Sequence, residues 1–432
     1  MWKHFLHKKV QQKSILAIVL LQKKTAVKLG IVKHAHMFQE RTLGMLYLTN
    51  VKSNKWGLFH YETTPQKRYT MKRIVYVIVI FIVFAGCQNK VDVNQEYMTL
   101  HDVKKAYLFP EIQTLKRSNM QSVKMPDYYL KNFIIVDSLL FVDTNQENGL
   151  LDIISLKSMK SYGRYLDKGK AKGEFLYGIN LTLQTTFECK NDSLYANIYD
   201  SGTGGLFKLN ITKTIIEKHA SLKELNFYSE IPHSAFWAKT ISDTLLLVRN
   251  IDEMETHQNR SIITREGIQT NHAVQKLNNF EIPINEDFNI MSSLISISPS
   301  REYIIEAMIG MNYVNIYSLN NNNIEYTICI GKELDKLSDI LSTSRYNRKY
   351  VFADLRTYNF GFAVLKYDIT ERTFQSEEEY APAILFFDWS GNPIGAINSE
   401  IKFNHFDYDE LNEVLYILDS DNKMLKIKIH II

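Results

Sequence analysis

The residues that first suggest chemistry lie at Gly163–Ala171, where glycine, arginine and lysine alternate as in a phosphate-binding loop. Such a loop needs a glycine five residues before its Gly-Lys pair and a serine or threonine after it. Those positions hold Arg164 and Ala171, and no helix pattern follows to supply a helix N-terminus for the phosphate. We therefore interpret the stretch as a basic connection between two sheets.

A nucleophile and its base are suggested by His233 and Ser234. No Gly-x-Ser-x-Gly turn surrounds Ser234, and adjacent residues of a strand point to opposite faces of a sheet. The histidines from Cys87 onward show no pair at the spacing of metal ligands, although separate sheets could still bring some together. They are His101, His219, His233, His257, His272, His405 and His430. The spacing predicts no catalytic residue, no metal site and no cofactor.

Two acidic stretches, Asp407–Glu410 and Asp419–Asn422, resemble parts of calcium-binding loops. Neither continues with the glycine and the distant glutamate that close such a loop. Asp and Asn also favour tight turns, because their side chains hydrogen-bond the nearby backbone. We interpret both stretches as hairpin turns. Asp388 and Trp389 lack the upstream Gly-His pair of a WD repeat.

The clearest chemical assignment is the thiol of Cys87. Two positive residues after Met71 precede the apolar run Ile74–Phe84, and small residues then lead to the cysteine. That order is typical of a secretory signal peptide, and the run is shorter than the roughly 20 residues that span a bilayer. We expect residues 71–86 to be a signal peptide.

The sequence Phe84-Ala85-Gly86-Cys87 resembles the lipobox of bacterial lipoproteins. In those proteins the chain is cut before the cysteine, whose sulfur takes a diacylglyceryl group. The resemblance implies lipid attachment at Cys87. Gln88 stands where an aspartate commonly retains such proteins in the inner membrane, so it favours the outer membrane of a bacterial cell envelope.

Charge separates the first 70 residues from the rest. Residues 1–70 hold 13 basic and 2 acidic residues, whereas 36 basic and 45 acidic residues follow from Cys87 onward. The mature part is acidic, which argues against nucleic acid as a partner. Because Met71 alone supplies the signal layout, we interpret residues 1–70 as a non-native or disordered extension. A basic cytoplasmic segment is the alternative.

After a polar tether at 87–97, residues 98–432 repeat one pattern of apolar run, tight polar turn and apolar run. The six repeats lie 49 to 61 residues apart, at Asp137, Asp192, Asp243, Pro299, Arg348 and Asp409. Repeats of this length with several strands each are typical of β-propellers, in which each small sheet is covered by its neighbours. The sequence predicts an all-β, six-bladed β-propeller.

The same pattern predicts the local structure of several segments within the propeller. The segment Tyr97–Val103 completes the last blade, and Glu333–Leu341 forms one short helix. Ile211 continues the alternating strand that begins at Phe207. Cys189 and Cys329 are buried free thiols, although an exported protein permits a disulfide.

One stretch resembles the glycine-rich segment between blades of TolB-like six-bladed propeller lipoproteins. It reads Gly163-Arg164-Tyr165-Leu166-Asp167-Lys168-Gly169-Lys170-Ala171-Lys172-Gly173-Glu174-Phe175. The C-terminal stretches Ile384–Ile394 and Asn412–Leu418 are similar to strands of that family. The resemblance spans about residues 97–432. It implies a bacterial envelope propeller and transfers no catalytic residue.

These observations favour a monomeric, lipid-anchored and non-catalytic propeller that binds a protein, peptide or glycan in the cell envelope. The alternative is a hydrolase or lyase whose site in the central channel uses a metal or acidic residues from several blades.

Overall fold

The computed structural model describes residues 95–431 apart from 226–230, 233–234, 321–323 and 377–379. The chain divides into two compact units, Met1–Asn89 and Lys90–Ile432, and all described residues belong to the second. The predicted signal peptide, Cys87, His233 and Ser234 therefore lie outside the described residues.

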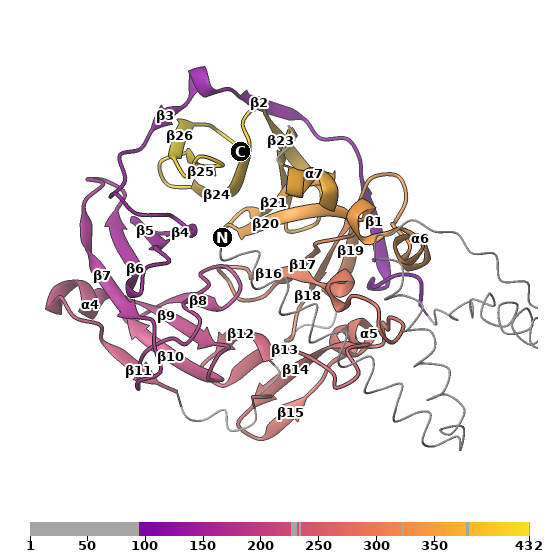
Figure 1. Ribbon diagram of the computed structural model, residues 1–432, viewed down its shortest axis with the longest axis horizontal. Helices are drawn as coiled ribbons and strands as arrows, with labels where there is room; N and C mark the ends of the chain where they lie inside the picture. The colour runs from indigo at the N-terminus through magenta and orange to yellow at the C-terminus, as the bar shows by residue number, and fades with distance from the viewer. Residues whose placement is uncertain (1–94, 226–230, 233–234, 321–323, 377–379, 432) are drawn as a thin grey trace, which may run out of the picture. The chain divides into compact units, whose positions relative to one another are not determined.

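Six small antiparallel sheets form a ring, which is a six-bladed β-propeller as predicted (Figure 1). Blades one to three are β4 (Asn132–Val136), β5 (Leu139–Asp143), β6 (Asn148–Ser155), β7 (Ser161–Asp167); β8 (Thr185–Lys190), β9 (Ser193–Asp200), β10 (Gly205–Asn210), β11 (Leu222–Glu224); and β12 (Ala235–Ser242), β13 (Leu245–Ile251), β14 (Gln258–Thr264), β15 (Gly267–Gln269).

Blades four to six follow in the same order along the chain. They are β16 (Ser293–Ile297), β17 (Ile304–Met308), β18 (Tyr313–Tyr317), β19 (Glu325–Ile330); β20 (Lys349–Thr357), β21 (Gly361–Thr370), β22 (Ala383–Asp388), β23 (Pro393–Ser399); and β24 (Phe403–Asp409), β25 (Val414–Asp419), β26 (Met424–Lys428). The first strand of each blade is innermost, and β24 contacts β4 while β20 contacts both β16 and β24.

An N-terminal strap, residues 95–122, runs along the outside of blades four, five and six (indigo in Figure 1). Its strands are β1 (Asp102–Ala106), β2 (Glu111–Leu115) and β3 (Gln121–Ser122). β1 pairs in parallel with β19, β2 in parallel with β23, and β3 antiparallel with β26. The strap thus covers two outer edges and supplies the fourth strand of blade six, which protects edges that would otherwise stay unpaired.

The strap corrects two predictions. Strand β3, not Tyr97–Val103, completes the last blade, and residues 102–106 instead extend blade four. Packing also begins within the predicted tether, because the Glu96 carboxylate accepts a hydrogen bond from the Ser338 hydroxyl at 2.8 Å. Met98 and Leu100 are buried, so this segment is part of the fold.

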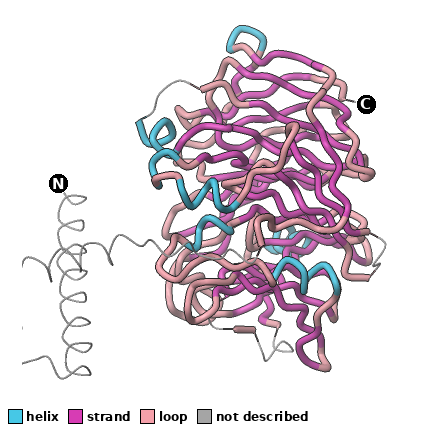
Figure 2. Tube along the Cα trace, turned by 90° about the vertical axis from the view of Figure 1, so that its right-hand side faces the viewer, coloured by secondary structure: helices cyan, strands magenta, loops and turns pink. Residues whose placement is uncertain are grey.

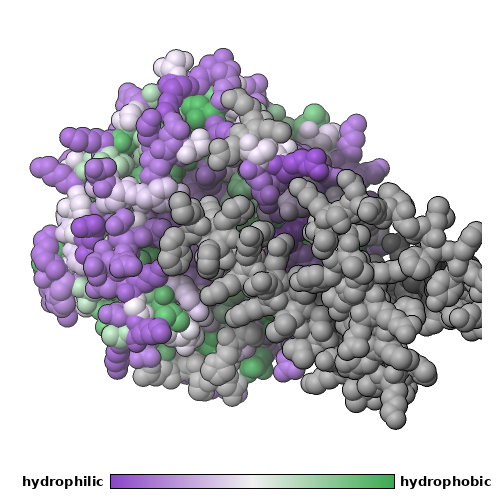
Figure 3. Space-filling model, in the orientation of Figure 1, coloured by the Kyte–Doolittle hydropathy of each residue, from purple (hydrophilic) through white to green (hydrophobic). Residues whose placement is uncertain are grey.

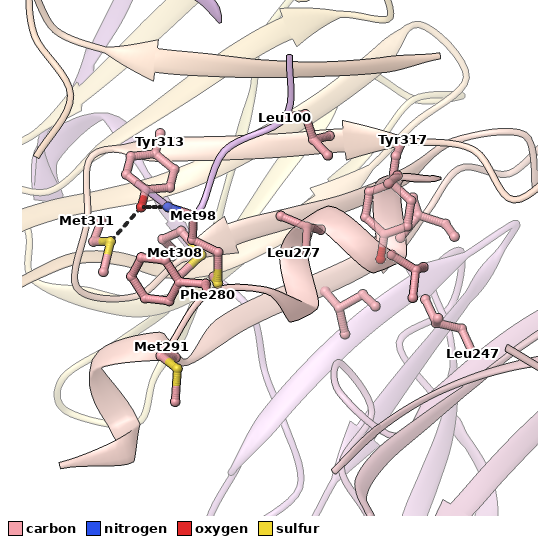
Figure 4. Packing of buried hydrophobic residues seen from close by; sticks show 14 of the residues in the cluster. Met98, Leu100, Leu247, Leu277, Phe280, Met291, Met308, Met311, Tyr313 and Tyr317 are labelled. Atoms are coloured by element: carbon pink, nitrogen blue, oxygen red, sulfur yellow. Dashed lines mark hydrogen bonds between the residues drawn. The ribbon is translucent and has the colours of Figure 1, made fainter. Parts of the chain in front are cut away.

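The apolar core lies between blades rather than within them. Six clusters of buried residues each join side chains of two neighbouring blades. The cluster between blades three and four also holds Met98 of the strap, whose amide donates to the Tyr313 hydroxyl (Figure 4). A single blade leaves both faces uncovered, and the ring buries them in pairs.

Among the described residues, four short helices and three 3₁₀ turns lie in the connections, at the margins of the strands (Figure 2). They are α4 (Ile211–Glu217), α5 (His272–Asn278), α6 (Leu337–Ser342), α7 (Glu371–Ser376), η2 (Arg117–Asn119), η3 (Phe288–Met291) and η4 (Arg345–Asn347). Helix α6 confirms a short helix near the predicted place, but Ile211 begins α4 instead of extending a strand, because Asn210 caps the helix by accepting from the Lys213 amide. Among the described residues no helix is long and apolar enough to cross a membrane.

The remaining corrections are local. Arg348 precedes β20, and the turn between β20 and β21 lies at 358–360. Cys329 is buried as predicted, whereas Cys189 is exposed, and both thiols are free.

Candidate functional site

The innermost strands bring charged side chains to the propeller axis. Asp354 and Arg356 of β20 and His405 and Asp407 of β24 stand two residues apart, so each pair shares one face of its strand. Arg356 donates to the carbonyl oxygen of Phe133 in blade one at 3.1 Å, although blade six lies between blades five and one. Only a side chain inside the ring can make that contact. With Lys239 of β12, these four residues are called the axial cluster.

Arg356 joins two carboxylates in the axial cluster. Its Nη1 lies 2.5 Å from Asp354 Oδ1, and its Nε lies 3.7 Å from Asp407 Oδ2. Asp407 Oδ2 accepts from the Ile135 amide at 2.7 Å, and Asp407 Oδ1 accepts from the Tyr358 hydroxyl at 3.2 Å. All of these side chains except that of His405 are buried.

Burial changes the protonation of this cluster. Burial raises the pKa of Asp407 to about 6, against the lowering effects of Arg356 and of two backbone amides. Burial lowers the pKa of Lys239 to about 7, and the charge of Arg356 adds to this. Lys239 Nζ donates to the carbonyl oxygens of Thr182 and Thr185, which satisfies two of its N–H groups.

The two faces of the ring differ in what they carry. We call the face where the innermost strands begin the entry face, and the opposite face, where they end in hairpin turns, the turn face. At the turn face Arg301 reaches from blade four to the carbonyl oxygens of Phe187, Thr240 and Ile241 in blades two and three. That side chain ties the innermost strands β8 and β12 to the turn between β16 and β17.

At the entry face, polar groups surround His405. Asn132 pairs across the sheet with Asp143, and the charge of His405 acts on Asp143. Neither Asn132 Oδ1 nor Asp143 Oδ2 has a hydrogen-bond partner, although Lys131 Nζ lies 3.5 Å from Asp143 Oδ2. Burial raises the pKa of Asp143. Both residues are buried, so these acceptors belong to the interior beneath the entry face, with Lys131 as the neighbouring cation.

A second buried network joins blades three and four. Glu306 accepts from Arg260 through Nε at 2.7 Å and Nη2 at 2.6 Å, from the Tyr317 hydroxyl at 2.7 Å and from the Ser293 hydroxyl at 2.8 Å. Arg249 adds a second cation at 3.5 Å. Burial alone would raise the pKa of Glu306, but the two arginines outweigh it and lower this pKa to about 2. We call this set the inter-blade network.

The predicted turns hold at two of the acidic positions and fail at one. Asp409 accepts from the Leu411 and Asn412 amides, and Asp419 accepts from the Lys423 amide, as expected of turn residues. Asp407 lies inside β24 and belongs to the axial cluster. The Gly163–Ala171 stretch was predicted to be a connection between sheets; residues 163–167 instead lie in β7, and only residues 168–171 begin the connection to blade two.

The fold also brings together two histidines that the spacing did not pair. His101 of the strap and His272 of α5 lie with their Nε2 atoms 3.3 Å apart. The other described histidines stay separate, and within the described part of the chain no group of three or more His, Cys, Asp or Glu side chains is arranged to hold a metal ion.

The axial carboxylates come from two blades, as the enzyme alternative requires, but they are enclosed. Asp354 and Asp407 are each bonded to Arg356 and to groups of the protein. Of the axial cluster only His405 has an appreciably exposed side chain, at 24%. The arrangement supports binding at the entry face better than attack on a substrate by a buried carboxylate.

Comparisons with known proteins give structural similarity only. No family model matches the sequence, and no curated protein is similar to it. A member of the DUF4221 family from Bacteroides vulgatus has 10% identity and a TM-score of 0.45, covering 72% of this chain and 97% of that one. A Bacteroides fragilis protein inferred to be exported has 12% identity and a TM-score of 0.43, covering 75% and 98%. At such identities the likeness concerns the fold alone.

Proposed function

We propose that the chain is a lipid-anchored, TolB-like binding propeller of the bacterial cell envelope, which works as a monomer without catalysis. Its ligand is a peptide, protein or glycan that docks on the entry face near His405. The observation that carries this proposal is the difference between the two faces of the ring.

The longest connections between the described strands lie at the entry face, and those at the turn face are mostly short, with residues 211–221, which hold α4, as the exception. Residues 168–184, 270–292, 331–348 and 371–382 all connect strands at the entry face, whereas residues 137–138, 191–192 and 243–244 suffice to turn the chain at the other. Long connections on a rigid scaffold are where binding residues usually lie.

Exposed hydrophobic side chains accompany these long connections. Those on the entry face are Tyr129, Tyr177, Met254, Ile284, Tyr346 and Phe374. The turn face also has some, among them Leu411, but fewer aromatic ones. In Figure 3 the hydrophobic side chains outside the grey atoms lie scattered among hydrophilic ones. Separate contacts of this kind suit a ligand held at several points rather than a permanent subunit interface.

The segment that leads from the propeller toward the predicted anchor contacts the same face. Glu96 contacts α6, which lies in an entry-face connection. Seven residues lie between Cys87 and Gln95, and the eight Cα–Cα steps of an extended chain reach about 28 Å. A lipid on Cys87 would therefore keep Gln95, where the described chain begins, within about 30 Å of the membrane. Replacing the thiol (Cys87→Ser) should move the protein from the membrane fraction to the soluble fraction.

The binding proposal is tested with arrays of random peptides and of peptidoglycan fragments. We expect the full-length protein to retain one class of probe, and the double variant Tyr129→Ser/His405→Ala to lose at least tenfold in affinity. Leu411→Ser, on the turn face, is the matched control and should bind normally. Binding that survives the double variant and disappears with Leu411→Ser would contradict the proposal.

A further inference from the structure

Two histidines from distant parts of the chain face each other at the outer edge of blade four. His101 stands just before β1 on the strap, and His272 is the first residue of α5. Their Nε2 atoms lie 3.3 Å apart, their ring centroids 4.9 Å apart, and their ring planes differ by 11°. His101 is exposed and 52% of the His272 side chain is exposed, so a solute can reach both nitrogens.

The far nitrogen of each ring is already engaged. His272 Nδ1 lies 2.7 Å from Glu325 Oε2, and Lys276 Nζ lies 3.2 Å from His101 Nδ1. A carboxylate that accepts from Nδ1–H leaves Nε2 of the same ring as the lone-pair donor, which is how histidines that bind metals are oriented. The Glu325 side chain is only 9% exposed, and its Oε1 has no hydrogen-bond partner.

We propose that His101 and His272 form a two-histidine site for a borderline divalent cation such as Zn²⁺, with Glu325 as the positioning residue. Two imidazole nitrogens bound at about 2.0–2.1 Å to one tetrahedral zinc ion lie about 3.3–3.4 Å apart, and the two Nε2 atoms already have that separation. Only two protein ligands are present among the described residues, so water completes the coordination and the ion stays open to a further ligand.

Zinc binding must displace the proton on His101 Nε2 and the hydrogen bond that Lys276 donates to His101 Nδ1. Because Lys276 donates to His101 Nδ1, the neutral ring carries its proton on Nε2 and donates it to His272 Nε2. The cation takes the place of that proton, the proton moves to Nδ1 or to solvent, and Lys276 turns away. Lys276 thus competes with the metal, and affinity should rise with pH.

The direct test is a zinc soak of crystals of the full-length protein, with anomalous density recorded at the zinc edge. A peak within coordination distance of both Nε2 atoms is expected. Zinc density at other positions only, or none, would overturn the proposal.

Zinc titration by calorimetry gives a second test in solution. His272→Gln should remove one bound zinc per molecule, whereas His219→Gln, also an exposed histidine beside a carboxylate, should remove none. Glu325→Gln should weaken the site about 10- to 100-fold, and Lys276→Gln should strengthen it. Equal zinc stoichiometry in the wild type and in His272→Gln would contradict the assignment.

Discussion

The inter-blade network around Glu306 and the axial cluster around Asp407 use the same groups and reach opposite results. Glu306 has two arginines, a tyrosine hydroxyl and a serine hydroxyl, and its pKa falls to about 2. Asp407 shares one arginine with Asp354, whose negative charge opposes its ionisation, and its pKa rises to about 6. The number of cations for each carboxylate decides whether burial is overcome.

The difference indicates different tasks. A carboxylate with a lowered pKa stabilises the fold above its unfolded pKa of about 4.5, and this contribution is lost as the pH falls toward 2. A carboxylate with a raised pKa does the reverse, because its ionised form costs stability as the pH rises from 3.8 through 6. The inter-blade network therefore locks two blades together, while the axial cluster carries charge at a cost in stability.

The largest expected effect is that of Glu306→Gln. Removing this charge leaves Arg249 and Arg260 buried without a counter-ion, so the variant should lose about 3–5 kcal/mol of unfolding free energy at pH 7. Urea denaturation measures this loss, with the exposed Glu302→Gln as the control. A loss below about 1 kcal/mol would mean that groups other than Glu306 compensate the charges of Arg249 and Arg260.

A smaller, pH-dependent effect is expected of Asp407→Asn. At pH 4 the wild-type carboxyl is largely protonated, and the two proteins should be similarly stable. As the pH rises to 7, ionisation of the buried Asp407 carboxyl destabilises the wild type, and the variant has no such group. The unfolding free energy of the variant should therefore rise by up to about 3 kcal/mol relative to the wild type. Denaturation curves at several pH values measure this, and a constant difference across the range would refute it.

The smallest effects come from removing one hydroxyl from each network. Tyr317→Phe removes a hydrogen bond to an ionised Glu306 and should cost about 1.5–3 kcal/mol. Tyr358→Phe removes the longer bond to Asp407 and should cost about 0.5–1.5 kcal/mol. Thermal unfolding of the two variants at pH 5 compares them, and equal losses would remove the contrast between the networks.

The sequence predicted the ring because its signals are local. Each repeat places two apolar runs around a turn, and such hairpins are visible within one stretch of sequence. The strap was missed because its pairing is distant: Asp102 lies opposite Tyr326, and no pattern in residues 102–106 identifies its partner. The outcome at Tyr97–Val103 shows that closure of a ring depends on contacts that sequence spacing does not contain.

The site was largely missed for a related reason. Asp354 and Arg356 stand two residues apart within the innermost strand β20, as His405 and Asp407 do within β24. Charged residues on one face of an innermost strand were the available signal. Their contact across the axis, and that of His101 with His272, required the closed ring.

Glu306 and Asp407, two buried carboxylates of one propeller, are held in opposite protonation regimes. A ¹³C NMR titration of the side-chain carboxyl carbons measures both pKa values, with Asp407→Asn and Glu306→Gln used for assignment. We predict that the Asp407 signal titrates with a midpoint near 6, and that the Glu306 signal stays that of a carboxylate down to pH 4. A midpoint for Asp407 at or below 4, or protonation of Glu306 above pH 4, would contradict the account.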